Sequence, residues 1–67
     1  MAANQNEEVV KGADGDTWVF WTDLDGDHWW RRKAPNGNIV GGSTEGYRNK
    51  AECLDNARRH GFAPAPK

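Results

Sequence analysis

Residues 17–40, TWVFWTDLDGDHWWRRKAPNGNIV, decide the fold of this chain. Residues 17–22 are dense in β-branched and aromatic side chains, a composition that favours a strand. The acidic turn around Gly26 then leads into a second strand at residues 28–33. The pair Asn36-Gly37 is strongly favoured in tight hairpins, so it predicts a third strand directly after it. The sequence therefore predicts a three-stranded antiparallel β-meander.

A single helix follows the third strand, which spans residues 39–43. Asn49 is a favourable N-cap residue, and Gly61 is the glycine expected just after the last helical turn. Three apolar residues form a narrow stripe along this helix: Ala51, Leu54 and Ala57. The expected fold class is α+β, with the helix packed on one face of the sheet and a possible short fourth strand.

The two ends of the chain differ from the central unit. Residues 1–15 are polar and acidic, which predicts a flexible leader with Val9-Val10 as the candidate for a short pairing strand. Residues 63–67 contain two prolines and predict an extended tail. The expected domain therefore spans residues 16–62, and either end can supply the fourth strand.

Size and composition limit how this fold is stabilised. A domain this small buries only about 60% of the surface that its unfolded chain exposes. Cys53 is the only cysteine, so an internal disulfide is excluded, and the two histidines are not spaced as zinc ligands. Aromatic side chains, four of them tryptophan, and association with a second copy remain as sources of stability. We expect no metal and no cofactor.

The net charge of −1 conceals an uneven distribution. Residues 1–27 carry seven acidic residues and one basic residue, whereas residues 28–67 carry eight basic and three acidic ones. This asymmetry predicts a folded chain with one acidic and one basic end. Two copies would then pack opposite ends together, or the basic half would face an anion.

A larger set of residues, in a fixed order, carries a family resemblance. It comprises Trp18-Val19-Phe20-Trp21, Gly26, Trp30-Arg31, Lys33-Ala34, Asn36-Gly37-Asn38-Ile39-Val40, Ser43, Glu45-Gly46-Tyr47, Asn49-Lys50-Ala51 and Cys53-Leu54. Over about two thirds of its length the chain thus resembles the YegP-like family of uncharacterised proteins. The resemblance implies three antiparallel strands and a helix, often followed by a short fourth strand. It also implies tandem repeats, or single copies that pair by exchanging the C-terminal strand, and it transfers no catalytic residues.

The chain departs from this family pattern at three places. His28 stands where the family usually has an aromatic residue, and Arg32 stands where it usually has leucine. Pro64 and Pro66 lie in the C-terminal segment and lack the amide that a strand ladder uses. These prolines argue against exchange of the C-terminal strand.

The second strand interleaves aromatic and basic residues. Trp29, Arg31 and Lys33 share one face, as in platforms that stack the bases of single-stranded nucleic acid. We favour a half-buried sheet whose cations keep the outer face soluble, because the overall charge of the chain is not basic. Trp21 belongs to the same face if Trp18 and Phe20 point toward the helix, while Tyr47 covers the sheet next to a bend at Gly46.

The remaining polar residues point to no chemistry. Asp23, Asp25 and Asp27 alternate as in a calcium loop, but Gly26 precedes the third aspartate and no glutamate follows at the required distance. This segment therefore predicts a hairpin turn. Cys53 is expected to be a buried, inert thiol, and no nucleophile has a base and an orienting partner nearby in the sequence.

These patterns favour a non-enzymatic interaction or assembly module. We expect a homodimer formed through the sheet edge and exposed tryptophans, with Trp21, Trp29, Arg31, Lys33 and Tyr47 as the candidate interaction surface. The alternative is single-stranded nucleic-acid binding through the aromatic and basic sheet face. The sequence has no apolar run long enough to span a membrane and no signal-peptide core, and its single cysteine fits the cytoplasm. It assigns neither a protein partner nor a small-molecule ligand.

Overall fold

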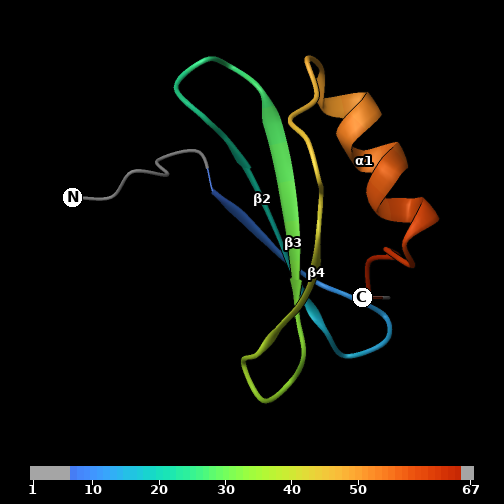
Figure 1. Cartoon of the computed structure of the whole chain (residues 1–67). Coiled ribbons are helices and arrows are strands. Elements are labelled where there is room, and N and C mark those ends of the chain that lie inside the picture. Colours follow the sequence, from blue (N-terminus) through green and yellow to red (C-terminus); the bar gives the residue numbers. More distant parts are fainter. Residues whose placement is uncertain (1–6, 66–67) are drawn as a thin grey trace.

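The structure, a computed structural model that describes residues 7–65, has an α+β fold (Figure 1). The strands and the helix are β1 (Glu8–Lys11), β2 (Thr17–Thr22), β3 (His28–Lys33), β4 (Ile39–Gly42) and α1 (Lys50–Arg59). All neighbouring strands are antiparallel, in the order β1-β2-β3-β4, and α1 packs on one face of the sheet. The predicted meander, helix and fourth strand are confirmed. No helix in the described part is long and apolar enough to cross a membrane.

The fourth strand comes from the N-terminal side. β1 pairs with β2 so that Val9 lies opposite Val19 and Val10 opposite Trp18. The side chain of Val10 packs against the buried core, which explains why this segment joins the sheet. The expected pairing strand at Val9-Val10 is therefore confirmed. The flexible leader is corrected for residues 8–11, and residues 1–6 lie outside the described part of the chain.

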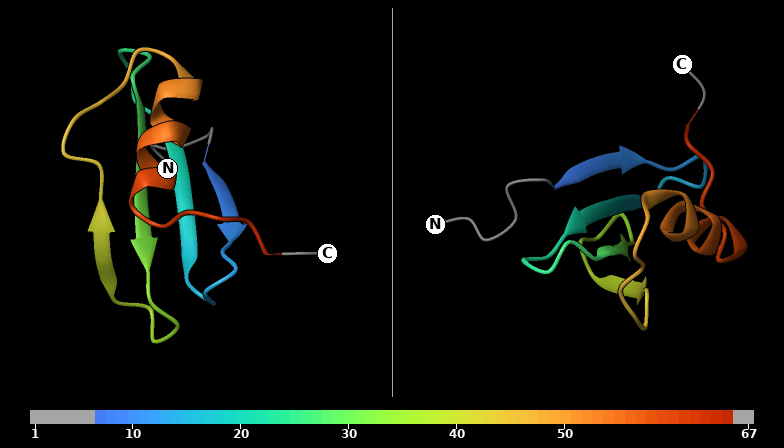
Figure 2. Two further views of the ribbon diagram at one scale, coloured as in Figure 1. Left: turned by 90° about the vertical axis from the view of Figure 1, so that its right-hand side faces the viewer. Right: turned by 90° about the horizontal axis from the view of Figure 1, so that it is seen from above.

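The C-terminal segment lies beside the end of β1 (Figure 2). The amide of Ala13 donates to the carbonyl of Ala63 at 2.7 Å, and the amide of Ala65 donates to the carbonyl of Lys11 at 2.9 Å. Pro64 lies between these two hydrogen bonds, at a position where the bridge does not need an N–H donor. The expected extended tail is thus paired over residues 63–65, and its last two residues lie outside the described part.

The core combines large side chains on the sheet with small ones on the helix. Trp18 and Trp30 are 0% and 2% exposed, and their ring centroids lie 5.3 Å apart. Cys53 and Ala57 face them from α1 and are equally buried. Small residues at these positions let the helix approach two indoles closely, which is how a short chain fills its core. The ring of Phe62 completes the cluster, and its centroid lies 5.2 Å from that of the Trp18 ring.

The buried face of α1 is rotated relative to the sequence expectation. Cys53 and Ala57, four residues apart, face the sheet, whereas Leu54 is only partly buried and Ala51 is exposed. The expected stripe of Ala51, Leu54 and Ala57 is therefore corrected. The prediction placed Leu54, the largest aliphatic residue of the helix, at the centre of its buried face. The two indoles of the sheet already fill that space.

Both ends of α1 are capped as the sequence predicts. The side-chain oxygen of Asn49 accepts a hydrogen bond from the amide of Glu52 at 2.9 Å. At the other end, Gly61 has a φ of 104°, and the amide of Phe62 donates back to the carbonyl of Ala57 at 3.0 Å. This turn brings the ring of Phe62 into the core.

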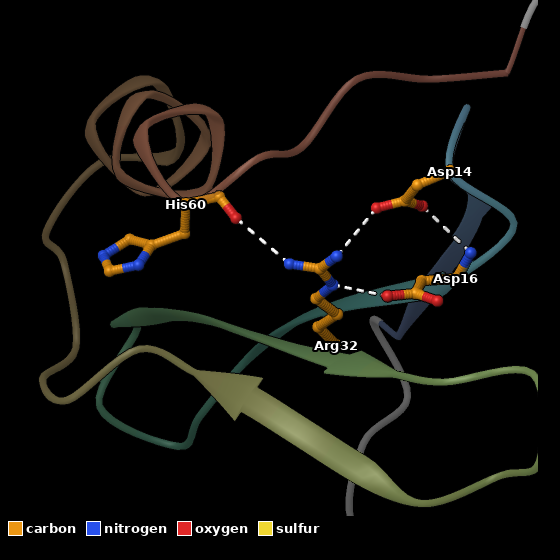
Figure 3. A network of polar contacts seen from close by, with 4 residues as sticks. All are labelled: Asp14, Asp16, Arg32 and His60. Atoms are coloured by element: carbon orange, nitrogen blue, oxygen red, sulfur yellow. Dashed lines mark hydrogen bonds and ion pairs between the residues drawn. The ribbon is translucent and has the colours of Figure 1, made fainter.

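Arg32 ties the helix end to the first hairpin (Figure 3). Its Nε donates to Asp16 Oδ2 at 2.6 Å and its Nη2 donates to Asp14 Oδ2 at 2.9 Å. Its Nη1 donates to the carbonyl of His60 at 3.3 Å, beyond the last turn of α1. The guanidinium carbon also lies 5.1 Å from the centre of the Trp18 ring. Sequence reasoning missed this role, because it treated Asp14 as part of a flexible leader and placed Asp16 at the very start of the domain.

Candidate functional site

The sheet face turned away from α1, called the open face here, carries four of the five candidate residues. Strand alternation places Trp21, Trp29, Arg31 and Lys33 on it, together with Val19. Trp21 and Trp29 are direct cross-strand partners, and their rings stack with centroids 6.3 Å apart and planes 12° apart. Both rings are partly buried, so the expectation of exposed tryptophans is only partly met.

The position of Trp29 is fixed by two contacts at the end of the sheet. Its Nε1 donates to Asp23 Oδ2 at 2.8 Å. A Cβ atom added at Gly46 would lie 3.0 Å from Trp29 Cε2 and 2.7 Å from the Cβ of Asp27. Gly46 is therefore required by close packing and does not have positive φ, which refines its expected role at a bend.

Asp23 organises the β2–β3 turn through its carboxylate. Oδ1 accepts hydrogen bonds from the amides of Asp25 at 2.9 Å and Asp27 at 3.0 Å. The bond from the Trp29 indole, followed by the bond from the Asp27 amide, lowers the pKa of Asp23 below its usual value. This segment is the hairpin turn that the sequence predicts, and the described residues contain no group of three side chains placed to hold a metal ion.

Arg31 covers the middle of the open face. Its guanidinium carbon lies 4.9 Å from the centre of the Trp21 ring, and its Nη2 donates to Glu7 Oε2 at 3.3 Å. The cross-strand neighbour Val19 is only 3% exposed although it points away from the helix. The chain's own side chains therefore close part of this face and engage one of its cations.

Tyr47 lies apart from the other four candidate residues. It pairs with His28 in an isolated bridge and packs against the core on the helix side of the sheet. Together with residues of α1 it lines a shallow depression. Burial raises the pKa of its hydroxyl, and the nearby carboxylate of Glu45 adds to this effect. The five candidate residues thus do not form one surface.

The acidic and basic halves of the sequence neutralise each other within the fold. The ion pairs that join them are Arg31–Glu7, Arg32–Asp14, Arg32–Asp16, Arg48–Asp27 and Lys50–Glu8, at N–O distances of 2.6 to 3.5 Å. Antiparallel pairing explains this result, because it sets the acidic β1–β2 hairpin beside β3. The same hairpin also reaches the start of the helix, where Glu8 binds Lys50. The expectation of one acidic and one basic end is therefore corrected.

Cys53 lies at the wall of a pocket of about 170 Å³ that His28, Lys50 and Trp29 also line. The thiol is almost fully buried, as expected. Burial raises its pKa, and the positive charge of Lys50 opposes this only in part. A thiol with a raised pKa is a weak nucleophile at neutral pH. Its geometry gives no support for catalysis.

The outer side of β4, called the β4 edge here, is a feature that sequence reasoning named only in general terms. No described segment pairs with it, and Ile39 and Val40 are 64% and 57% exposed. Ile39 lies opposite Lys33 and Gly41 opposite Arg32, so Val40 is an extra residue that forms a bulge. The sequence signal was the run IVGG, which contains no charged residue.

The comparisons with known proteins give one match. A family model described as Domain of unknown function (DUF1508) matches residues 23–58, from the β2–β3 turn to the last turn of α1. No curated protein and no solved structure shows significant similarity to the chain. The matched segment contains β3, β4 and all of α1 except its last residue, and with them Trp29, Arg31, Lys33 and Tyr47.

Proposed function

The chain belongs to the DUF1508 family, a domain of unknown function, and we propose that it is a non-enzymatic assembly module that pairs two copies through their β4 edges. An unpaired strand presents a row of amide and carbonyl groups that a second strand can bind. Around a two-fold axis, two β4 edges would meet in antiparallel orientation and join two sheets into one.

The observation that carries this proposal is the contrast between the two edges of the sheet. β1 has charged residues at both ends, Glu8 and Lys11, and the C-terminal segment pairs beside it. Charged residues and covering segments are the usual protection of an edge strand. β4 contains no charged residue, no segment among residues 7–65 pairs with its outer side, and it exposes Ile39 and Val40 instead.

Gly41 supports the same conclusion. Its φ is not positive, and a Cβ atom added there would have no neighbour within 4 Å. The chain's own fold therefore does not require glycine at this position. A glycine at an edge lets another backbone approach closely, and a second β4 strand would make that approach. The bulge at Val40 shortens the regular edge, so we expect a weak, reversible dimer.

Sedimentation equilibrium of two variants tests this proposal. Val40→Lys places two like charges near the two-fold axis and is expected to shift the chain to a monomer. Ala51→Lys adds the same charge at an exposed position of α1, away from β4, and is expected to associate like the unaltered chain. Equal association constants for the two variants would contradict the proposal.

The alternative, single-stranded nucleic-acid binding, has less support. Arg31 is engaged with Glu7 and Trp21, and the indole nitrogen of Trp29 is engaged with Asp23. Among the described residues, Lys33 and Lys11, which lie on either side of Thr17, are the cations left without an ion pair on this face. A fluorescence titration with an oligonucleotide at low salt checks this alternative, since phosphate contacts weaken steeply as salt is added.

Two further proposals complete this account. We propose that the chain is a YegP-like member of its family, on the strength of the ordered residue matches from Trp18 to Leu54. We also propose a cytoplasmic location, which the single buried thiol of Cys53 supports because a reducing compartment keeps cysteines unpaired.

A further inference from the structure

The tip of the β2–β3 turn carries an apolar side chain without any contact to explain it. Leu24 is 102% exposed, the largest value among the exposed aliphatic residues in the described part of the chain. The turn stands at one end of the sheet, beyond the ends of β2 and β3 (Figure 1). A single exposed leucine is common on protein surfaces, so its meaning depends on what surrounds it.

The turn holds Leu24 in a fixed position. The amide of Asp23 donates to the carbonyl of Asp27 at 2.9 Å, and the amide of Gly26 donates to the carbonyl of Asp23 at 3.0 Å. The carboxylate of Asp23 binds two further amides of the same turn. Leu24 is therefore presented on a rigid support, which reduces the entropy that docking would cost.

A matching apolar groove lies between β1 and α1. The helix packs over β3 and leaves part of β2 and β1 uncovered, while the C-terminal segment closes one end (Figure 2). The groove has a volume of about 290 Å³. Its apolar lining consists of Val10, Phe20, Leu54, Phe62 and Pro64.

The charges around the tip and the groove are complementary. At the tip, Asp25 forms no ion pair among the described residues, whereas Asp27 is bound by Arg48. At the groove, Lys50 is bound by Glu8 at 3.2 Å, whereas Arg58 is exposed and forms no ion pair in the described part of the chain. One acidic group beside an apolar tip thus matches one basic group beside an apolar groove.

We propose that the Leu24 tip of one copy docks in the β1–α1 groove of a second copy, with Asp25 placed beside Arg58. This inference goes beyond the β4 pairing proposed above and uses different surfaces. The tip and the groove are distinct parts of the chain, so each contact is heterologous and can link one β4-paired dimer to the next. The contact area is small, and we expect it to form only at high protein concentration.

An intermolecular NMR experiment tests the contact directly. In a concentrated sample that mixes ¹³C-labelled and unlabelled copies, we expect nuclear Overhauser effects between the Leu24 methyl groups of one copy and the Phe62 ring of another. Leu24→Ser is expected to weaken this association about tenfold, because the apolar contact is lost. Absence of these effects in the unaltered chain would overturn the proposal.

A charge-reversal cycle tests the paired charges. Asp25→Arg and Arg58→Asp are each expected to weaken the tip contact, and the double variant is expected to recover it. Both positions are exposed, so these variants should leave the fold intact, as their amide spectra will report. A double variant that associates no better than the single ones contradicts the pairing.

The same experiments in the Val40→Lys background separate the two proposals. Tip contacts that persist without β4 pairing support this inference, whatever the fate of the β4 dimer. A β4 dimer in which Leu24→Ser changes nothing overturns the tip contact and leaves the proposed function in place. If tip contacts form in a chain that shows no β4 dimer, the proposed function is contradicted and the tip contact is supported.

Discussion

The guanidinium of Arg32 donates to the carboxylate of Asp16 at 2.6 Å, and so connects β3 to the turn that follows β1. The same guanidinium reaches the carbonyl of His60 at the end of α1. One side chain thereby holds together the first hairpin, the third strand and the helix end. Hydrogen bonding to Asp16 raises the pKa of Arg32 above its usual value, which favours the charged guanidinium.

Arg32→Lys should lower the melting temperature, because a lysine cannot contact both carboxylates and the helix-end carbonyl with one compact ammonium group. Asp16→Asn should cost more stability than Asp14→Asn, since the Asp16 side chain is 13% exposed and the Asp14 side chain is 37% exposed. Thermal unfolding followed by circular dichroism measures this order. If all three variants melt at the same temperature as the unaltered chain, Arg32 does not hold these elements together.

Ala57→Leu should destabilise the fold by about 1–3 kcal/mol, because the added atoms enter a core filled by two indoles. Ala51→Leu makes the same change on the exposed side of the same helix and should be close to neutral. Urea denaturation of both variants measures the difference. If both variants unfold at the same urea concentration, the assignment of the buried helix face is wrong.

Gly46→Ala should destabilise the fold, because its methyl group would overlap Asp27 and the Trp29 ring. Gly41→Ala is the matched control, since its methyl group meets nothing within 4 Å of the same chain. The proposed dimer adds a second readout, because Gly41→Ala should weaken association while leaving the unfolding of the monomer almost unchanged. Tryptophan fluorescence during urea denaturation reports the first effect, and sedimentation reports the second.

The Trp29 indole proton should titrate with Asp23 at a midpoint below the usual aspartate pKa of 3.8. Because the folded pKa is lowered, the stabilisation from these hydrogen bonds is complete above the unfolded pKa and is lost as pH falls through the folded one. Proton NMR of the indole signal measures the midpoint. Asp23→Asn should remove the titration, and a midpoint above 3.8 would contradict the geometry of the turn.

Cys53 should react slowly with thiol reagents at neutral pH and become reactive once urea unfolds the chain. Burial raises the folded pKa of this thiol above its usual value of 9.0. The unfolded chain therefore loses the proton first, so stability declines as pH rises through the unfolded pKa. Cys53→Ser should lack this alkaline decline, and fast labelling of the folded chain would contradict the buried position.

The sequence predicted the parts of the fold that depend on local signals. Asn36-Gly37 and the aromatic alternation of residues 17–22 define two hairpin strands, and Asn49 and Gly61 define the helix ends. These signals act within a few residues, so one sequence is enough to find them. Local signals do not decide which face of α1 is buried, because the two indoles that pack against it belong to β2 and β3.

The candidate site was predicted in part for the same reason. Strand alternation correctly grouped Trp29, Arg31 and Lys33, but Tyr47 lies on the opposite side because its segment pairs with His28. The ion pairs of Arg31 and Arg32 join residues 16 to 24 positions apart, and sequence spacing contains no signal for them. The Leu24 tip and the β1–α1 groove became visible only when the whole chain was folded.

The central claim is that two copies pair through their β4 edges. Light scattering on the unaltered chain, over a wide dilution series, tests it most directly. We predict a mass that rises with concentration from the 7.5 kDa of one chain toward twice that value, and that Val40→Lys holds at the value of one chain. A mass of 7.5 kDa at every concentration, or a dimer that Val40→Lys leaves unchanged, would contradict the claim.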